Sequence, residues 1–267
     1  MTVAASEEQA VVIPRSRAEA IAAFGSGSGV TVMAGGTILM PELTSGRLRP
    51  NRVLLLARAG LDEIRTEGAS LVIGACVRLV DLGNAPEPLG TAARRVADPE
   101  IRNQATIGGN LCARPGPDYS RGDLQAPLIA LGATVGSVGT GGERTEPVED
   151  FLRGDPSTRL VLEIDVPTNR RGASAAVRRP HAHAYTILAV TASVAEDGSD
   201  LRVAVAGAGP QAVRLTSVEK GGLAAADPNA ANGDVTVVDD ALASAWYRQK
   251  MLPVLTARVL SQLKEPA

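Results

Sequence analysis

Two short glycine-rich turns are the residues of this sequence best suited to ligand chemistry. One covers residues 34–37 (Ala-Gly-Gly-Thr), and the other covers residues 106–110 (Thr-Ile-Gly-Gly-Asn). Glycine adopts a positive φ and allows a ligand to approach the backbone closely, so that successive N–H groups can point at one oxyanion. The side chains of Thr37, Thr106 and Asn110 add hydrogen-bond donors. We therefore expect both turns to bind anions.

A single Gly-Gly turn is more often a tight connection between a strand and a helix than a ligand site. Two such turns in one chain are stronger evidence, because a dinucleotide pyrophosphate carries two phosphates and can take donors from both sides. Neither turn has the Gly-x-Gly-x-x-Gly spacing of a Rossmann domain, and neither contains the lysine of a phosphate-binding loop. The pair predicts an extended dinucleotide lying between two lobes.

The composition argues against other classes of site. The 267 residues include 27 Lys and Arg against 29 Asp and Glu, a net charge of −2 without a basic run, so nucleic acid is not an expected partner. Two cysteines (Cys76, Cys112) and two histidines (His181, His183) are too few for a tetracysteine iron–sulfur cluster or a Cys/His zinc site, and we assign no metal. A disulfide between the cysteines is possible, but reduced thiols are the expectation in a cytoplasmic protein.

The longest apolar runs, at residues 53–57 and 71–75, are far shorter than the roughly 20 residues of a membrane-spanning helix. The first residues become acidic at Glu7 and Glu8 and lack the basic start and apolar stretch of a secretory signal. We expect no membrane span and a cytoplasmic protein.

Local patterns divide the chain into three regions, at residues 1–60, 61–170 and 171–267. In the first region, Ser16 and Glu19 fit a capping box. The elements expected there are a helix at 18–24, a strand at 30–34, a helix at 38–48 and a strand at 53–56. They would form a first α/β lobe, with the first glycine turn between its strand and its second helix.

The second region is expected to form another α/β lobe. Its elements would be a hairpin at 63–66 and 71–75, a helix at 89–97, a break at 98–100, a helix at 124–131, and strands at 134–137 and 161–166. The polar residues 169–174 are the expected linker to the third region. That region would contain antiparallel strands at 185–194 and 201–208 and a helix at 241–263, with Leu252, Leu255, Val259 and Leu263 on one face and Pro253 marking a kink or a new start.

One family shares both turns. The first turn with Leu39 and Pro41, and the run at residues 101–111 (Ile-Arg-Asn-Gln-Ala-Thr-Ile-Gly-Gly-Asn-Leu), resemble the FAD-binding medium subunit of molybdenum hydroxylases. This family includes the flavoprotein subunit of carbon monoxide dehydrogenase and the flavin domain of xanthine dehydrogenase. The resemblance extends over nearly the whole chain. It implies an α+β fold, with a two-lobed vanillyl-alcohol-oxidase-like FAD-binding domain followed by a C-terminal antiparallel sheet with helices.

The resemblance also implies which residues would bind a noncovalent FAD. Residues 32–39 and 106–110 would hold the pyrophosphate, and Asp123 would accept a hydrogen bond from a sugar-like hydroxyl, unless it serves only as a helix N-cap. Val161 falls where the family makes a backbone or apolar contact with the flavin. The implied cofactor-binding residues are Val32, Met33, Ala34, Gly35, Gly36, Thr37, Ile38, Leu39, Thr106, Ile107, Gly108, Gly109, Asn110, Asp123, Val161, Arg178 and Tyr185.

Three features depart from the family pattern or have a simpler explanation. No lysine precedes the third region, so Arg178 or Arg179 would have to supply a positive charge near the flavin, and a solvated linker charge is the alternative. Tyr185 would cover one face of the flavin ring or simply pack in the core. The stretch at residues 114–122 is longer than usual and could change the surroundings of the flavin or contacts with partners.

The implied function is electron transfer within an oxidoreductase, with no catalytic residue on this chain. Electrons would pass from iron–sulfur clusters via FAD to a final acceptor. The clusters and molybdopterin would belong to partners, a small two-iron two-sulfur subunit and a large molybdopterin subunit, in a dimer of heterotrimers. The alternatives are a stand-alone flavin oxidase or reductase of the related fold, and a nonenzymatic nucleotide-binding assembly subunit.

Overall fold

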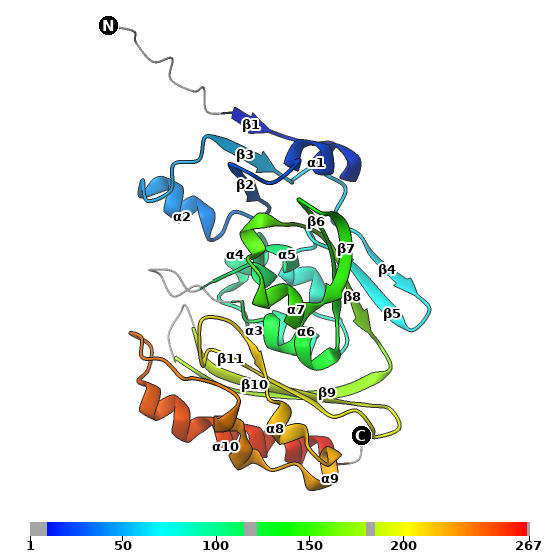
Figure 1. Cartoon of the computed structure of the whole chain (residues 1–267), viewed down its shortest axis with the longest axis vertical. Helices are drawn as coiled ribbons and strands as arrows, with labels where there is room; N and C mark the ends of the chain where they lie inside the picture. The colour runs from blue at the N-terminus through cyan, green and yellow to red at the C-terminus, as the bar shows by residue number, and fades with distance from the viewer. Residues whose placement is uncertain (1–9, 115–121, 180–184, 266–267) are drawn as a thin grey trace, which may run out of the picture.

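Three sheets follow one another along the longest axis of the molecule (Figure 1). The computed structural model describes residues 10–114, 122–179 and 185–265. The first sheet has the strand order β1-β3-β2, the second has the order β4-β5-β8-β6-β7, and the third has the order β12-β11-β10-β9. Helices and antiparallel sheets occur together, so the predicted α+β fold is confirmed.

The first sheet is parallel and is built from β1 (Ala10–Val12), β2 (Val30–Met33) and β3 (Arg52–Leu55). Helix α1 (Arg17–Phe24) begins at Ser16, whose hydroxyl accepts a hydrogen bond from the backbone N–H of Glu19 at 3.1 Å, as the capping box predicts. Helix α2 (Leu39–Thr44) is shorter than the expected 38–48, because the chain turns at Gly46 with φ +71°. Ala20 and Phe24 of α1 pack against Leu160 and Leu162 of the second sheet.

The second sheet is antiparallel throughout and contains the predicted hairpin, β4 (Ile64–Glu67) with β5 (Ser70–Gly74). Its other strands are β6 (Thr134–Gly139), β7 (Gly142–Pro147) and β8 (Leu160–Pro167). The edge strand β7 was not predicted, because its sequence Gly-Glu-Arg-Thr-Glu-Pro is polar and mostly exposed and has no apolar face.

Short helices surround the second sheet. They are η1 (Leu79–Leu82), α3 (Leu89–Arg95), α4 (Pro99–Arg102), α5 (Ile107–Leu111), α6 (Gln125–Leu131), α7 (Val148–Arg153) and η2 (Pro156–Thr158). The break expected at residues 98–100 is instead the start of α4, where the carboxylate of Asp98 accepts a hydrogen bond from the N–H of Ile101 at 2.8 Å. All seven residues of α6 are buried, and the helix packs on β10 and β11 of the third sheet.

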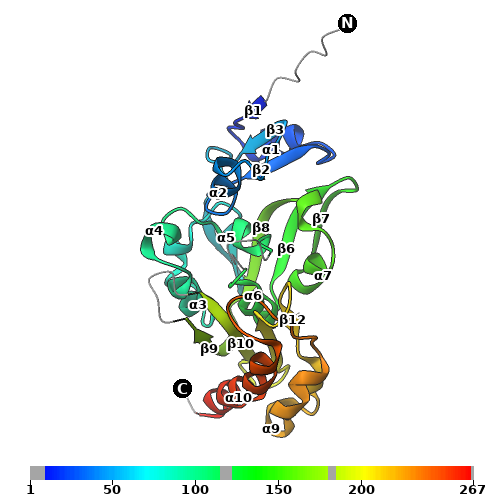
Figure 2. The same ribbon diagram turned by 90° about the vertical axis from the view of Figure 1, so that its left-hand side faces the viewer.

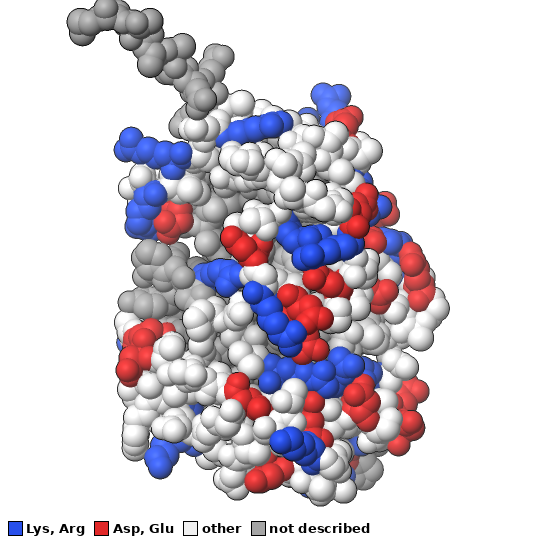
Figure 3. Space-filling model, viewed as in Figure 1, with Lys and Arg blue, Asp and Glu red and all other residues white. Residues whose placement is uncertain are grey.

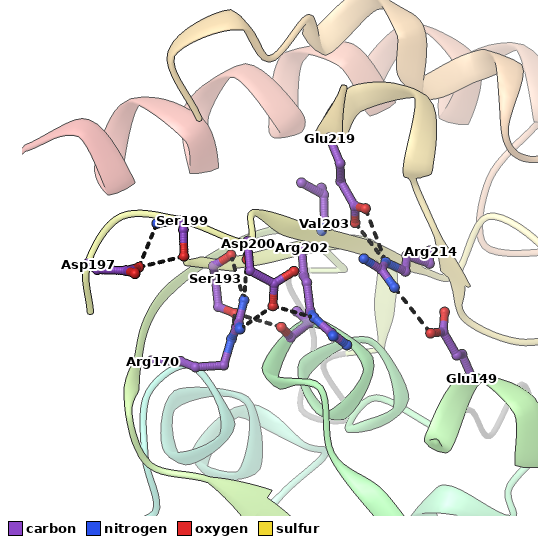
Figure 4. A network of polar contacts seen from close by, with 11 residues as sticks. Glu149, Arg170, Ser193, Asp197, Ser199, Asp200, Arg202, Val203, Arg214 and Glu219 are labelled. Carbon is purple, nitrogen blue, oxygen red and sulfur yellow. Dashed lines mark hydrogen bonds and ion pairs between the residues drawn. The ribbon is translucent and has the colours of Figure 1, made fainter. Parts of the chain in front are cut away.

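The third sheet contains β9 (Arg170–Arg178), β10 (Thr186–Ala195), β11 (Arg202–Ala206) and β12 (Val213–Arg214). The antiparallel pairing of the two predicted strands is confirmed. The linker expected at residues 169–174 is wrong, because β9 pairs with β10 from Arg170 to Arg178. Arg170, the first residue of β9, donates to the hydroxyl of Ser193 at 2.8 Å and to the carboxylate of Asp200 at 2.7 Å (Figure 4).

Helices cover the outer face of the third sheet (Figure 1). They are α8 (Thr216–Glu219), α9 (Gly222–Ala225), η3 (Pro228–Gly233) and α10 (Ala245–Lys264). Leu252, Leu255, Val259 and Leu263 of α10 are buried, as predicted. The helix begins at its N-cap Ser244 rather than at residue 241, and it runs through Pro253 without ending there.

Within the described residues, no helix is long and apolar enough to cross a bilayer. Acidic and basic side chains are interspersed on the face drawn in Figure 3, without a large area of one sign.

Candidate functional site

The two glycine turns face one cavity of about 830 Å³ between the first and second sheets. Its lining includes residues of the edge strand β2 in the first sheet, of β8 in the second sheet, and of α5 and η2. The predicted residues that line it are Val32, Ala34, Gly36, Thr37, Ile38, Leu39, Thr106, Gly108, Gly109, Asn110, Asp123, Val161 and Tyr185. Within the described chain, the predicted residues Met33, Gly35, Ile107 and Arg178 are not part of this lining.

The first turn is held against the segment that precedes the second. A Cβ added at Gly35 would lie 1.9 Å from the carbonyl oxygen of Gln104, so only glycine fits at this point. Gly36 adopts φ +71°, a conformation that favours glycine, and its carbonyl accepts the N–H of Met40 at 2.8 Å as α2 begins. Gly35 therefore acts by close packing, whereas Gly36 and Thr37 reach the cavity.

The second turn begins α5. The hydroxyl oxygen of Thr106 accepts the N–H of Gly109 at 3.2 Å, and Gly108 donates its N–H to the carbonyl of Ala75 at 2.9 Å. A Cβ at Gly108 would lie 2.9 Å from the Cβ of Ala75, whereas Gly109 is exposed on the cavity side. Ile107 is fully buried beneath the turn, so its side chain anchors α5 in the core.

Asn110 and Asp123 connect the second turn to the start of α6. The side-chain oxygen of Asn110 accepts the N–H of Leu124 at 2.9 Å, so this atom serves the fold rather than a ligand. The alternative that Asp123 caps α6 is wrong, because the N-cap residue is Leu124. Asp123 instead lines the cavity and accepts a hydrogen bond from the hydroxyl of Thr186 at 3.3 Å. Tyr185 lies next to Thr186 and is the residue of the third region that reaches the cavity among those described.

Several lining residues were not predicted from the sequence. Arg159 follows η2 and donates from Nε to the hydroxyl of Ser137 at 2.9 Å and from Nη2 to the carbonyl of Ser137 at 3.1 Å. Burial lowers the pKa of the Arg159 guanidinium, and Arg144 lowers it further. Asp155 and Ser157 line the same end of the cavity. No local pattern marks these residues, because they reach the cavity only when β6 and β8 pair.

Neither cysteine is part of a disulfide, and each thiol is protonated at neutral pH. Cys112 ends α5 and lines the cavity, and burial raises the pKa of its thiol to about 12. Burial and the nearby charge of Asp62 raise the pKa of Cys76 to about 12 as well. His181 and His183, and residues 115–121 of the long stretch, lie outside the described residues.

The residues present fit an extended dinucleotide. The cavity volume of about 830 Å³ lies within the roughly 300–1,000 Å³ that is usual for cofactor sites. Two backbone turns face the cavity, one after β2 and the other at the start of α5. A side chain at Gly35 would push these turns apart. Apolar side chains such as Val32, Leu39 and Val161 provide surface for flat rings, while Asp123 and Arg159 provide polar ends.

The fold and the cavity define an α+β protein with a dinucleotide-sized site between its first two sheets. The chain belongs to the family described as FAD binding domain in molybdopterin dehydrogenase, whose model matches residues 6–169. The resemblance to the FAD-binding subunits of molybdenum hydroxylases is therefore confirmed.

Individual relatives agree with this assignment. The chain is 35% identical over 173 residues to the carbon monoxide dehydrogenase medium chain of Hydrogenophaga pseudoflava. This aligned segment is 60% of this chain and 58% of that protein. It is 30% identical over 264 residues to the 6-hydroxypseudooxynicotine dehydrogenase complex subunit alpha of Paenarthrobacter nicotinovorans, covering 88% and 87%. The structure of reconstituted CO dehydrogenase from Oligotropha carboxidovorans matches with a TM-score of 0.83 at 25% identity, over 100% of both chains. The chain is thus an oxidoreductase subunit.

Proposed function

We propose that this chain binds one FAD noncovalently in the cavity between the first and second sheets. The observation that carries the proposal is the meeting of the two glycine turns, held together by the contact of Gly35 with Gln104. Residues 32–39 and 106–110 would hold the pyrophosphate, mainly through backbone N–H groups. Asp123 would accept a hydrogen bond from a sugar-like hydroxyl, since its carboxylate lines the cavity.

The remaining lining would hold the ring systems and keep water from them. Val161 is 5% exposed and offers an apolar contact, and Tyr185 is 36% exposed and offers a flat phenol at the cavity wall. Arg159 provides a cation whose direction is fixed by its two hydrogen bonds to Ser137. Bound here, FAD would supply the redox chemistry, taking electrons that originate at iron–sulfur clusters and passing them to a final acceptor.

The partners follow from the same family. The relatives include a chain named as a medium chain and a chain named as a complex subunit. We propose that this chain assembles with a small two-iron two-sulfur subunit and a large molybdopterin subunit as a dimer of heterotrimers.

Two measurements test the proposal. The purified full-length chain should show flavin absorbance after incubation with FAD, and acid precipitation should release the flavin because no covalent bond holds it. Substrate oxidation should require the partner subunits. A chain that binds no FAD would overturn the cofactor assignment, and a chain that oxidises substrate alone at the full rate of the complex would overturn the subunit assignment.

A further inference from the structure

We propose that Arg102 and Arg178 are positioning residues that hold the end of α3 as one wall of the FAD cavity. Neither side chain lines the cavity. The two guanidinium groups would act through the backbone of residues 95–97, and Arg178 would also tie this wall to the third sheet. The inference rests on the proposed function for the identity of the ligand.

The contacts are made with consecutive carbonyl groups. Nη1 of Arg102 donates to the carbonyl of Val96 at 2.7 Å and to that of Ala97 at 2.9 Å. Nη2 of Arg178 donates to the carbonyl of Arg95, the last residue of α3. The last carbonyls of a helix lack partners within the helix, so they need donors from elsewhere. Here two arginines, from α4 and β9, supply these donors.

The clamped segment is strained. Ala97 adopts φ +42°, in the left-handed region where a Cβ meets backbone atoms. Such a conformation persists only where the surrounding structure enforces it. Arg102 donates to the carbonyls of the two peptide units that flank the Cα of Ala97, which fixes the direction of the chain at this point. Val96 and Ala97 both line the cavity, so the clamp sets the position of the wall.

Arg178 links this wall to the third sheet. Strand β9 is the edge of that sheet and runs beside α3 (Figure 2). A Cβ at Gly172 would lie 2.5 Å from Cδ of Pro88, so β9 contacts the start of α3, and Arg178 at the other end of β9 contacts its last residue. Burial lowers the pKa of Arg178, and the charge of Asp123, a cavity residue, opposes this effect. Arg178 therefore stands between the α3 end and the polar side of the cavity.

A double-variant cycle in the full-length chain separates this role from general stability. Arg102→Met removes the donors but keeps an apolar stem, so Val96 and Ala97 relax in the free chain. FAD binding must then restore their arrangement without the two hydrogen bonds, and we expect this cost to weaken FAD binding about tenfold. Ala97→Gly alone is the second single variant of the cycle, and its dissociation constant is the reference for the double variant. In the double variant glycine occupies the left-handed conformation without strain, so part of the affinity returns. Arg258→Met, on the exposed side of α10, is the control.

Amide hydrogen exchange of the FAD-free chain gives a second, ligand-independent reading. Exchange at residues 93–98 should be faster in Arg102→Met and in Arg178→Met than in the wild type or the Arg258→Met control, while far-UV circular dichroism shows that each variant is folded. Arg102→Lys replaces Arg102→Met if the latter does not fold. Unchanged exchange in both variants overturns the clamp, and a double variant that binds FAD no better than Arg102→Met overturns the role of strain at Ala97. A wild-type chain that binds no FAD overturns the proposed function instead, and the exchange data still decide the clamp.

Discussion

Gly35 lies so close to the backbone of Gln104 that a Cβ at Gly35 would be 1.9 Å from the Gln104 carbonyl oxygen. This contact joins the first lobe to the segment that leads into the second glycine turn. It explains why a residue that does not line the cavity can still decide the cavity's shape. The convergence of the two turns is thus a packing property that can be tested separately from ligand binding.

Gly35→Ala should disturb both stability and cofactor binding. The added methyl group must displace backbone rather than a flexible side chain, so we expect the free energy of unfolding to fall by about 2 kcal/mol. Denaturant unfolding of the FAD-free chain measures this effect, and FAD titration measures the loss of affinity. Gly141→Ala is the matched control, because a Cβ at Gly141 meets nothing within 4 Å. Equal behaviour of the two variants would contradict the contact.

Gly109→Val should remove FAD binding while leaving the fold intact. Gly109 is exposed on the cavity side, and a Cβ there meets only the hydroxyl of Thr106, at 3.1 Å. A branched side chain would nevertheless cover the backbone N–H groups that a phosphate must approach. The measurement is flavin content after gel filtration, with Gly141→Val as control. Normal flavin content in Gly109→Val would remove the second turn from the site.

The two buried thiols predict a change in stability at alkaline pH. The pKa of Cys112 is raised from 9.0 to about 12 in the folded chain, as is that of Cys76. Below pH 9.0 both thiols are protonated in the folded and in the unfolded chain, so the free energy of unfolding is at its full value. As the pH rises from 9.0 toward about 12, the unfolded chain releases these protons first, and the free energy of unfolding falls. Urea unfolding of the wild type and of a Cys76→Ala/Cys112→Ala variant across this pH range isolates the part of the pH dependence that the two thiols cause. If the variant showed the same pH dependence as the wild type, the thiols would not be the cause of the alkaline loss of stability.

Arg214 should stabilise the docking of the second and third sheets. It donates to Glu219 of α8 at 3.0 Å and to Glu149 of α7 at 3.2 Å, and Glu219 also accepts the N–H of Val203 at 2.7 Å (Figure 4). Arg214→Met leaves two partly buried carboxylates without this partner, so we expect a loss of about 2 kcal/mol in denaturant unfolding. Arg153→Met, whose side chain is 70% exposed in its pair with Asp150, should have little effect.

The sequence predicted those features of the fold that depend on neighbouring residues. The capping box at Ser16, the hairpin of β4 and β5 and the buried face of α10 follow from local patterns of capping, turn and apolar residues. Residues 169–174 look like a linker in the sequence, because the small and basic residues that begin β9 become strand-like only when β10 supplies hydrogen bonds and Ser193 and Asp200 supply partners for Arg170.

For the candidate site too, only the features marked by a local pattern could be predicted from the sequence. The two glycine turns could be located from composition and spacing, and the structure brings them to one cavity. Arg159 and the Val96–Ala97 wall could not, because no local pattern marks them as cavity residues: Arg159 is positioned by its hydrogen bond to Ser137, which is 22 residues away in the chain. The family resemblance implies that Arg178 or Arg179 supplies a positive charge near the flavin, and in the structure Nη2 of Arg178 donates to the carbonyl of Arg95.

The burial of α6 limits how this chain can be divided. Every residue of the helix is buried, and Gln125 at its start donates to the carbonyls of Leu111 and Ala113 while accepting the N–H of Ala212. A shortened chain that stopped after β8 would leave the β10-facing side of this helix in water. The portion that holds the glycine turns therefore relies on the C-terminal sheet to keep one side of this helix out of water.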